Sequence, residues 1–155
     1  MKRVLLITGG SRGIGAATAL LAAQDGWAVA VNYANNQAAA NQVVQAIAQA
    51  GGQAIAVQGD VADEAQIVRM FAAVDQQLGR VTGLVNNAGV VDVTARVEDM
   101  SWQRLERMMR INVLGTFACT KEAIRRMSTR HGGQGGVIVN LSSVAARLGA
   151  PAQYC

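Results

Sequence analysis

The chain has 155 residues, of which 51% are hydrophobic, 4% aromatic and 15% charged, and its formal net charge is +4. This length and composition predict one globular domain. No stretch approaches the about 20 apolar residues that cross a bilayer, so we expect no membrane span. The basic residues lack the interleaved aromatic side chains that stack on bases, so we expect no nucleic-acid binding. The surplus positive charge belongs either to a solvated surface or to an anion-binding site.

The cysteines and the single histidine indicate the compartment and exclude a metal centre. Cys119 and Cys155 have neither disulfide nor metal-ligand spacing, and one histidine does not complete a ligand set. The apolar run after Met1 has the length of a strand, so we expect no secretory leader. A reducing, cytoplasmic location therefore fits the sequence best.

Strands and helices are predicted to alternate along the chain. Apolar runs predict strands at residues 3–8, 28–33, 53–58, 82–86 and 137–141. Helical spacing predicts helices at residues 14–24, 37–50, 64–78, 102–110 and 113–129. No hairpin signal separates neighbouring strands, so the sequence predicts an α/β fold with a doubly wound parallel sheet and helices on both faces.

Local signals support several of these helices. Asn35 or Asn36, Asp63 and Ser101 each stand where a side chain can cap the first turn. The first helix is expected to bury an apolar face made of Ile14, Ala17, Leu20, Leu21 and Ala23.

A glycine-rich turn between the first strand and the first helix predicts a phosphate site. Gly9, Gly13 and Gly15 leave room for backbone N–H groups to approach an anion, and the helix N-terminus favours negative charge. In a parallel sheet, ligands bind at the carboxyl ends of the strands. The polar segments at residues 60–61, 86–89 and 142–143 should therefore converge on the same edge as this turn.

Five motifs together resemble the short-chain dehydrogenases/reductases over the whole chain. They are Thr8-Gly9-x-x-x-Gly13-x-Gly15, Asp60-Val61, Asn86-Asn87-Ala88-Gly89, Asn112 and Asn140-Leu141-Ser142-Ser143. The resemblance implies a Rossmann-like, dinucleotide-binding domain over residues 1–155, with the C-terminal part of the family fold missing. It also implies hydride transfer between a nicotinamide cofactor and a small-molecule carbonyl or secondary alcohol.

The charges at the second strand favour NADP(H) over NAD. NAD-binding proteins usually place a carboxylate at the end of this strand, to hold the ribose 2′-OH. Here the position belongs to Asn32 or Tyr33, while Arg12 in the glycine turn can pair with a 2′-phosphate. With the resemblance, the predicted cofactor-binding residues are Gly9, Ser11, Arg12, Gly13, Ile14, Gly15, Asn32, Tyr33, Asp60, Val61, Asn87, Ala88 and Gly89.

The resemblance also assigns catalytic roles. Ser143, the second serine of its pair, would hold the substrate oxygen, and Asn112 would kink its helix and hold a water of the proton relay. Tyr154 is the candidate for the proton-transferring tyrosine, or it is a neighbour lining the pocket of a tyrosine just beyond residue 155. In the family, a lysine four residues after this tyrosine lowers its pKa, and that position lies beyond Cys155.

Three further expectations concern that missing lysine and the family's longer chains. The alternative to an active reductase is a catalytically inactive nucleotide-binding fragment or module. Without further strands, the strand at residues 137–141 would be a poorly covered edge, open to pairing. The resemblance implies a dimer or tetramer for the full-length form, associated through the helix at residues 113–129.

Overall fold

The computed structural model describes residues 2–149 and shows one five-stranded sheet. Its strands are β1 (Val4–Ile7), β2 (Ala28–Tyr33), β3 (Gln53–Gln58), β4 (Gly83–Asn86) and β5 (Val137–Asn140). They run in the order β3-β2-β1-β4-β5, and every neighbouring pair is parallel. The predicted doubly wound α/β fold is confirmed, since the chain starts in the centre of the sheet and builds outward on both sides.

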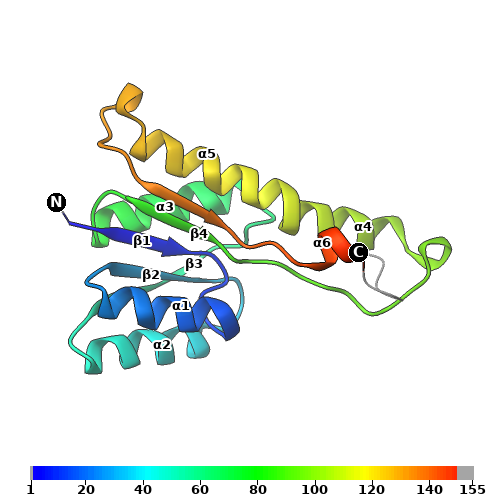
Figure 1. Cartoon of the computed structure of the whole chain (residues 1–155), viewed down its shortest axis with the longest axis horizontal. Helices are drawn as coiled ribbons and strands as arrows, with labels where there is room; N and C mark the ends of the chain where they lie inside the picture. The colour runs from blue at the N-terminus through cyan, green and yellow to red at the C-terminus, as the bar shows by residue number, and fades with distance from the viewer. Residues whose placement is uncertain (1, 150–155) are drawn as a thin grey trace.

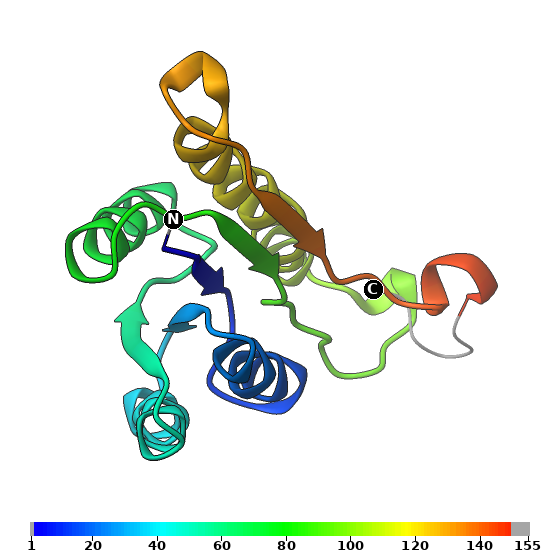
Figure 2. The same ribbon diagram turned by 60° about the vertical axis from the view of Figure 1, so that its left-hand side comes forward.

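Helices cover both faces of the sheet (Figures 1 and 2). On one face lie α1 (Gly13–Gln24) and α2 (Gln37–Gln49), and on the other lie α3 (Glu64–Gln77) and α5 (Gly115–Met127). Shorter elements are η1 (Val97–Asp99), α4 (Trp102–Met109), η3 (Thr129–His131) and α6 (Ala145–Leu148). No helix within residues 2–149 is long and apolar enough to cross a membrane.

The helices predicted at residues 102–110 and 113–129 form one continuous helical run. A single π-helical segment, η2 (Arg110–Leu114), joins α4 to α5. The predicted break around Asn112 is therefore a local widening of the helix, which a π turn produces by adding one residue to a turn.

Side-chain caps fix the starts of three helices, as predicted. Asn36 accepts a hydrogen bond from the third residue after it, and Ser101 does the same at the start of α4. Asp63 accepts from the backbone of Gln66 and the residue before it, at the start of α3. Hydrogen bonds from the Gln66 side chain and backbone hold the pKa of Asp63 below its usual value.

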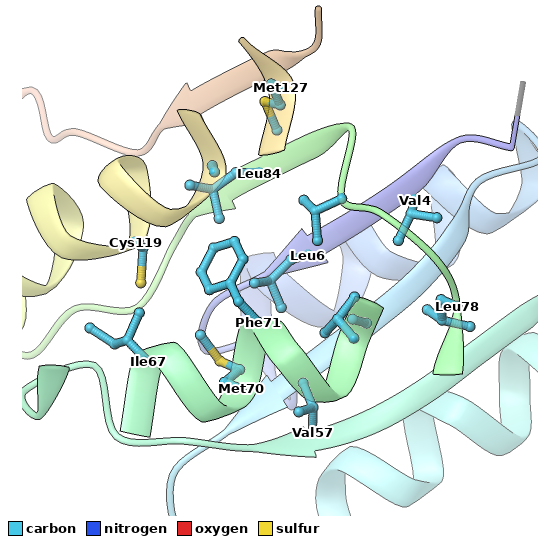
Figure 3. Close-up of a cluster of buried hydrophobic side chains, with 14 of the residues drawn as sticks. Val4, Leu6, Val57, Ile67, Met70, Phe71, Leu78, Leu84, Cys119 and Met127 are labelled. Carbon is cyan, nitrogen blue, oxygen red and sulfur yellow. The ribbon is translucent and has the colours of Figure 1, made fainter. Parts of the chain in front are cut away.

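Two apolar clusters fill the spaces between the sheet and its helices. Under α3 and α5, Phe71 is fully buried beside Leu6 and Leu84, as Figure 3 shows. Under α1 and α2, the cluster includes Ile7 and Val31. A central strand buried on both faces needs an apolar residue at every position, which explains the uninterrupted run in β1.

The face that α1 buries matches the predicted one only in part, since Leu20 and Ala23 pack against the core cluster as expected. Ile14 and Leu21 are 68% and 63% exposed, whereas Gly15 and Ala19 are buried. The helix is apolar on nearly every side, so hydrophobic spacing could not select the face. Close packing of Gly15 against the glycine turn and Asn87 decides it instead.

The strand at one edge of the sheet, β5, is only partly covered. In β5, Val137 and Val139 are each 46% exposed, and Leu141, just after the strand, is 38% exposed. β5 pairs with β4 on one side and is the last strand of the described sheet. The expectation of a poorly covered fifth strand is thus confirmed for residues 2–149.

Candidate active site

A cavity of about 790 Å³ opens at the carboxyl ends of the central strands. All the predicted cofactor-binding residues line it except Gly15: Gly9, Ser11, Arg12, Gly13, Ile14, Asn32, Tyr33, Asp60, Val61, Asn87, Ala88 and Gly89. Its volume lies within the range of about 300–1,000 Å³ typical of ligand sites. The structure therefore brings together segments that are far apart in the sequence, while their binding of a cofactor stays a prediction.

Two glycines of the turn meet different geometric requirements. Gly13 has φ +54° and no atom within 4 Å of the position that a Cβ would occupy. Gly15 has no such freedom, because its Cβ would lie 2.6 Å from both Asn87 Nδ2 and the Gly9 carbonyl oxygen. Gly13 thus allows the turn, whereas Gly15 lets α1 pack against the loop after β4.

Thr8 and Asn87 join the glycine turn to the loop after β4. Asn87 Nδ2 donates to the carbonyl oxygens of Thr8 and Gly9, at 2.9 and 3.0 Å. In return, Thr8 Oγ1 accepts from the backbone N–H groups of Asn87 and Ala88, both at 3.0 Å. These four hydrogen bonds fix the two loops relative to each other.

Asn32 uses its side chain within the protein. Its Oδ1 accepts from Gly9 N at 3.1 Å, and its Nδ2 donates to the carbonyl oxygens of Gly59 and Val57, at 2.9 and 3.3 Å. The residue is 2% exposed. Asn32 therefore supports the cavity from below, and the ends of three strands meet at its amide.

Three charged side chains line the cavity: Arg12, Asp60 and Arg107. Asp60 Oδ1 accepts from the backbone N–H of Ala62 at 2.9 Å. Two guanidinium groups against one carboxylate give the wall a net positive charge, which suits an anionic ligand. Arg107 was not predicted, since it lies on α4, away from every sequence motif.

Asn112 lies in the π segment and holds the loop after β4. Its Oδ1 accepts from Val90 N and its Nδ2 donates to the Val90 carbonyl oxygen, both at 2.9 Å. The Asn112 backbone carbonyl accepts from Thr116 Oγ1 at 3.2 Å. The predicted helix distortion is present, and the side chain fixes one wall of the cavity.

Ser143 stands exposed just beyond the carboxyl end of β5. Its Oγ accepts a hydrogen bond from Ala145 N at 3.2 Å, which leaves the hydroxyl hydrogen available to a ligand. Neither Ser143 nor Asn112 lines the 790 Å³ cavity. The third predicted catalytic residue, Tyr154, lies outside the described residues.

A network that the sequence analysis missed positions the strand before Ser143. Asn86 Nδ2 donates to Asn140 Oδ1 at 2.8 Å and to Thr120 Oγ1 at 3.1 Å. Asn86 is buried and Asn140 is exposed, and asparagines at matching ends of two predicted parallel strands could have indicated this pair. The network ties β4, β5 and α5 together immediately before the serine pair.

A smaller cavity, of about 290 Å³, lies at the opposite end of the sheet. Arg80 lines it and donates to the carbonyl oxygens of Gly132 and His131, at 3.0 and 2.9 Å. None of the predicted site residues lines this cavity. Among the described residues, no group of three metal-ligating side chains occurs.

A parallel, doubly wound sheet with a glycine turn and a cavity at its carboxyl edge defines the class of nucleotide-binding α/β proteins. The comparison with protein families narrows this class. The model of the short chain dehydrogenases matches residues 3–155. The chain belongs to this family of oxidoreductase enzymes.

Individual relatives agree with this assignment. The chain is 52% identical over 151 residues to the Uncharacterized oxidoreductase YgfF of Escherichia coli K12, covering 97% of this chain and 61% of the relative. It is 40% identical to a 3-oxoacyl-[acyl-carrier-protein] reductase of Synechocystis, covering 97% and 60%. A Serratia marcescens short-chain dehydrogenase/reductase, solved as a mutant, superposes with a TM-score of 0.85 at 34% identity, covering 97% and 62%. The chain thus spans about three fifths of the length of these relatives.

Proposed function

We propose that residues 1–155 form the dinucleotide-binding domain of an NADP(H)-dependent oxidoreductase that interconverts a carbonyl compound and a secondary alcohol. The observation that carries the choice of cofactor is Arg12 at the cavity, with Asn32 and Tyr33 ending β2 where an acid would select NAD. A carboxylate at this place would repel a 2′-phosphate, whereas the amide of Asn32 does not.

The described residues fit a dinucleotide. Gly13 and Gly15 keep side chains away from the turn that would hold the pyrophosphate, and Ile14 is exposed on the cavity wall. The Thr8–Asn87 hydrogen bonds fix the turn before a ligand arrives. Because the site is preformed, ligand binding does not include the entropy cost of ordering its loops.

The cofactor supplies the hydride, and the protein side chains handle the proton and the substrate oxygen. Because Ser143 Oγ already accepts from Ala145 N, its hydrogen can donate to the substrate oxygen and stabilise the charge that develops there. Tyr154 is proposed to transfer the proton, or to line the pocket beside the tyrosine that does. Asn112, through its bonds to Val90, keeps the loop between the cofactor and these groups in place.

The substrate class, location and assembly of the whole protein are proposals as well. The Synechocystis relative and a Staphylococcus aureus relative at 37% identity are named 3-oxoacyl-[acyl-carrier-protein] reductases, which favours a carbonyl substrate here. We propose a cytoplasmic homo-oligomer, a dimer or a tetramer. The exposed Leu114, Phe117 and Ile124 supply apolar surface for association along η2 and α5.

Binding titrations test the cofactor proposal. We expect the chain to bind NADPH more tightly than NADH, measured by nucleotide fluorescence. Arg12→Gln should weaken NADPH at least about tenfold, since a charge-assisted hydrogen bond contributes about 1.5–3 kcal/mol. The NADH affinity should change little.

Arg130→Gln is the matched control, because Arg130 is exposed on η3, away from the cavity. Equal losses of NADPH and NADH affinity in Arg12→Gln would contradict the 2′-phosphate contact. Binding without turnover on a panel of carbonyl compounds would instead favour a nucleotide-binding module.

A further inference from the structure

Three arginines, two in α4 and one at the start of η2, differ in their contacts. Arg104 pairs with Asp92 and donates to the Val93 carbonyl oxygen, and Arg110 pairs with Glu106 at 2.9 Å. Arg107 forms no ion pair or side-chain hydrogen bond with any residue from 2 to 149. It lies on the wall of the 790 Å³ cavity instead.

The helix carries Arg107 to the mouth of that cavity. Gly115 packs so closely against Val61 that a Cβ there would lie 2.6 Å from the Val61 carbonyl oxygen. Ile111, one turn earlier, packs against the buried core and also lines the cavity. Arg107 lies one further turn earlier and is exposed. Gly115, Ile111 and Arg107 therefore form a row along the helical run that leads from the core to the rim of the cavity.

The wall below Arg107 is apolar and fixed. It includes Val61, Val90 and Ile111. Asn112 forms hydrogen bonds with both backbone groups of Val90, and Gly115 packs against Val61. Val90 and Val61 are therefore held in position. A flat aromatic ring can lie against such a wall, whereas a phosphate finds no donor there.

We propose that Arg107 covers the purine ring of the bound dinucleotide, with its guanidinium plane stacked on the base. This inference rests on the proposed function, because it needs a dinucleotide in the cavity. A guanidinium is planar and weakly hydrated, and it stacks on aromatic faces and nucleobases. Arg12 then holds the 2′-phosphate from the side of α1, and Arg107 holds the base from the side of α4.

Calorimetry with two ligands and two variants tests the contact. The ligands are NADPH and adenosine 2′,5′-bisphosphate, which carries the base and the 2′-phosphate without nicotinamide. Arg107→Met should weaken both about tenfold, since a stacked base contributes about 1–3 kcal/mol and 1.4 kcal/mol is a factor of ten. Arg107→Lys keeps the charge without the plane, so it should bind about as weakly as the Met variant.

Arg110→Met is the control, because it removes a guanidinium from the next turn of the same helical run and should leave both affinities unchanged. Unchanged binding in Arg107→Met would overturn the inference, as would recovery of wild-type affinity in Arg107→Lys, which would indicate a phosphate contact. A loss for NADPH alone would place the contact outside the adenosine half. If the unmodified chain binds neither ligand, the proposed function itself fails.

Discussion

The two halves of the sheet differ in how completely they are built. From β1 to β3, the strands are covered by α1, α2 and α3, and β2 is buried at every position. Around β5, nearly half of the surface of Val137 and of Val139 is exposed, and Ser143 stands at an open strand end. The difference shows that the half that lines the cavity is complete within the described residues, whereas the half that carries the serine is not.

Hydrogen bonding explains why the first half is self-sufficient. The side chains that fix the glycine turn are Thr8, Asn32 and Asn87, and their partners lie between residues 8 and 88. None of these contacts involves β5 or α5. The cavity geometry is therefore set by residues that precede the serine strand, and it can be disturbed without touching that strand.

The largest expected effect follows from removing the Asn32 amide. Asn32→Leu fills the space but leaves Gly9 N and the Gly59 carbonyl without their partner. Each unsatisfied buried group costs about 1–3 kcal/mol, so the free energy of unfolding should fall by about 3 kcal/mol. Urea denaturation measures this loss.

The exposed Asn41 of α2 provides the control. Asn41→Ala should change the free energy of unfolding by less than about 0.5 kcal/mol, as surface substitutions usually do. If Asn32→Leu were equally harmless, the amide would not support the turn, and hydrogen bonding would not explain why the first half is self-sufficient.

A second, smaller effect is expected at Gly15. In Gly15→Ala, the new methyl group would lie 2.6 Å from Asn87 Nδ2, so the loop after β4 must move. Overpacking of this kind costs about 1–3 kcal/mol. The loss in NADPH binding free energy should exceed the loss in the free energy of unfolding, because the displaced atoms line the cavity.

Ala17→Ser is the matched control on the same helix, since Ala17 is exposed. It should leave both the thermal midpoint and NADPH binding nearly unchanged. A Gly15→Ala protein that binds NADPH normally would show that the loop after β4 adapts more freely than its hydrogen bonds imply.

The smallest effect concerns acid stability in the less complete half. Burial raises the pKa of Glu122, but hydrogen bonds from Arg126 and Arg125 outweigh it and hold the pKa below its ordinary value of 4.5. A lowered pKa stabilises the fold above the ordinary value, and this contribution is lost as the pH falls through the folded-state pKa. Chemical denaturation below pH 4.5 should therefore show a steeper loss in the unmodified chain than in Glu122→Gln. Parallel curves would show that the network does not contribute to acid stability.

Local chemistry made much of the fold predictable from the sequence. The runs that form β2 and β3 were delimited correctly because polar or glycine residues follow each buried strand. The capping roles of Asn36, Asp63 and Ser101 depend on neighbouring residues alone, so no knowledge of the tertiary structure was needed.

What could not be predicted depends on contacts between distant segments. The buried face of α1 is selected by the approach of Gly15 to Asn87, which hydrophobic spacing does not encode. Asn32 was expected near the ribose, and its internal hydrogen bonds become visible only with β3 in place. Arg107 belongs to no motif and reaches the cavity through helix geometry.

The π turn of η2 sets the rotational phase of α4. In a continuous α-helix, a residue eight positions before Gly115 would point about 80° away from it, at about 100° per residue. The additional residue of a π turn removes about 100°, which brings Arg107 within about 20° of the line through Gly115. Deleting one residue from η2 would thus turn a different side chain toward the cavity while leaving the sequence of α4 unchanged.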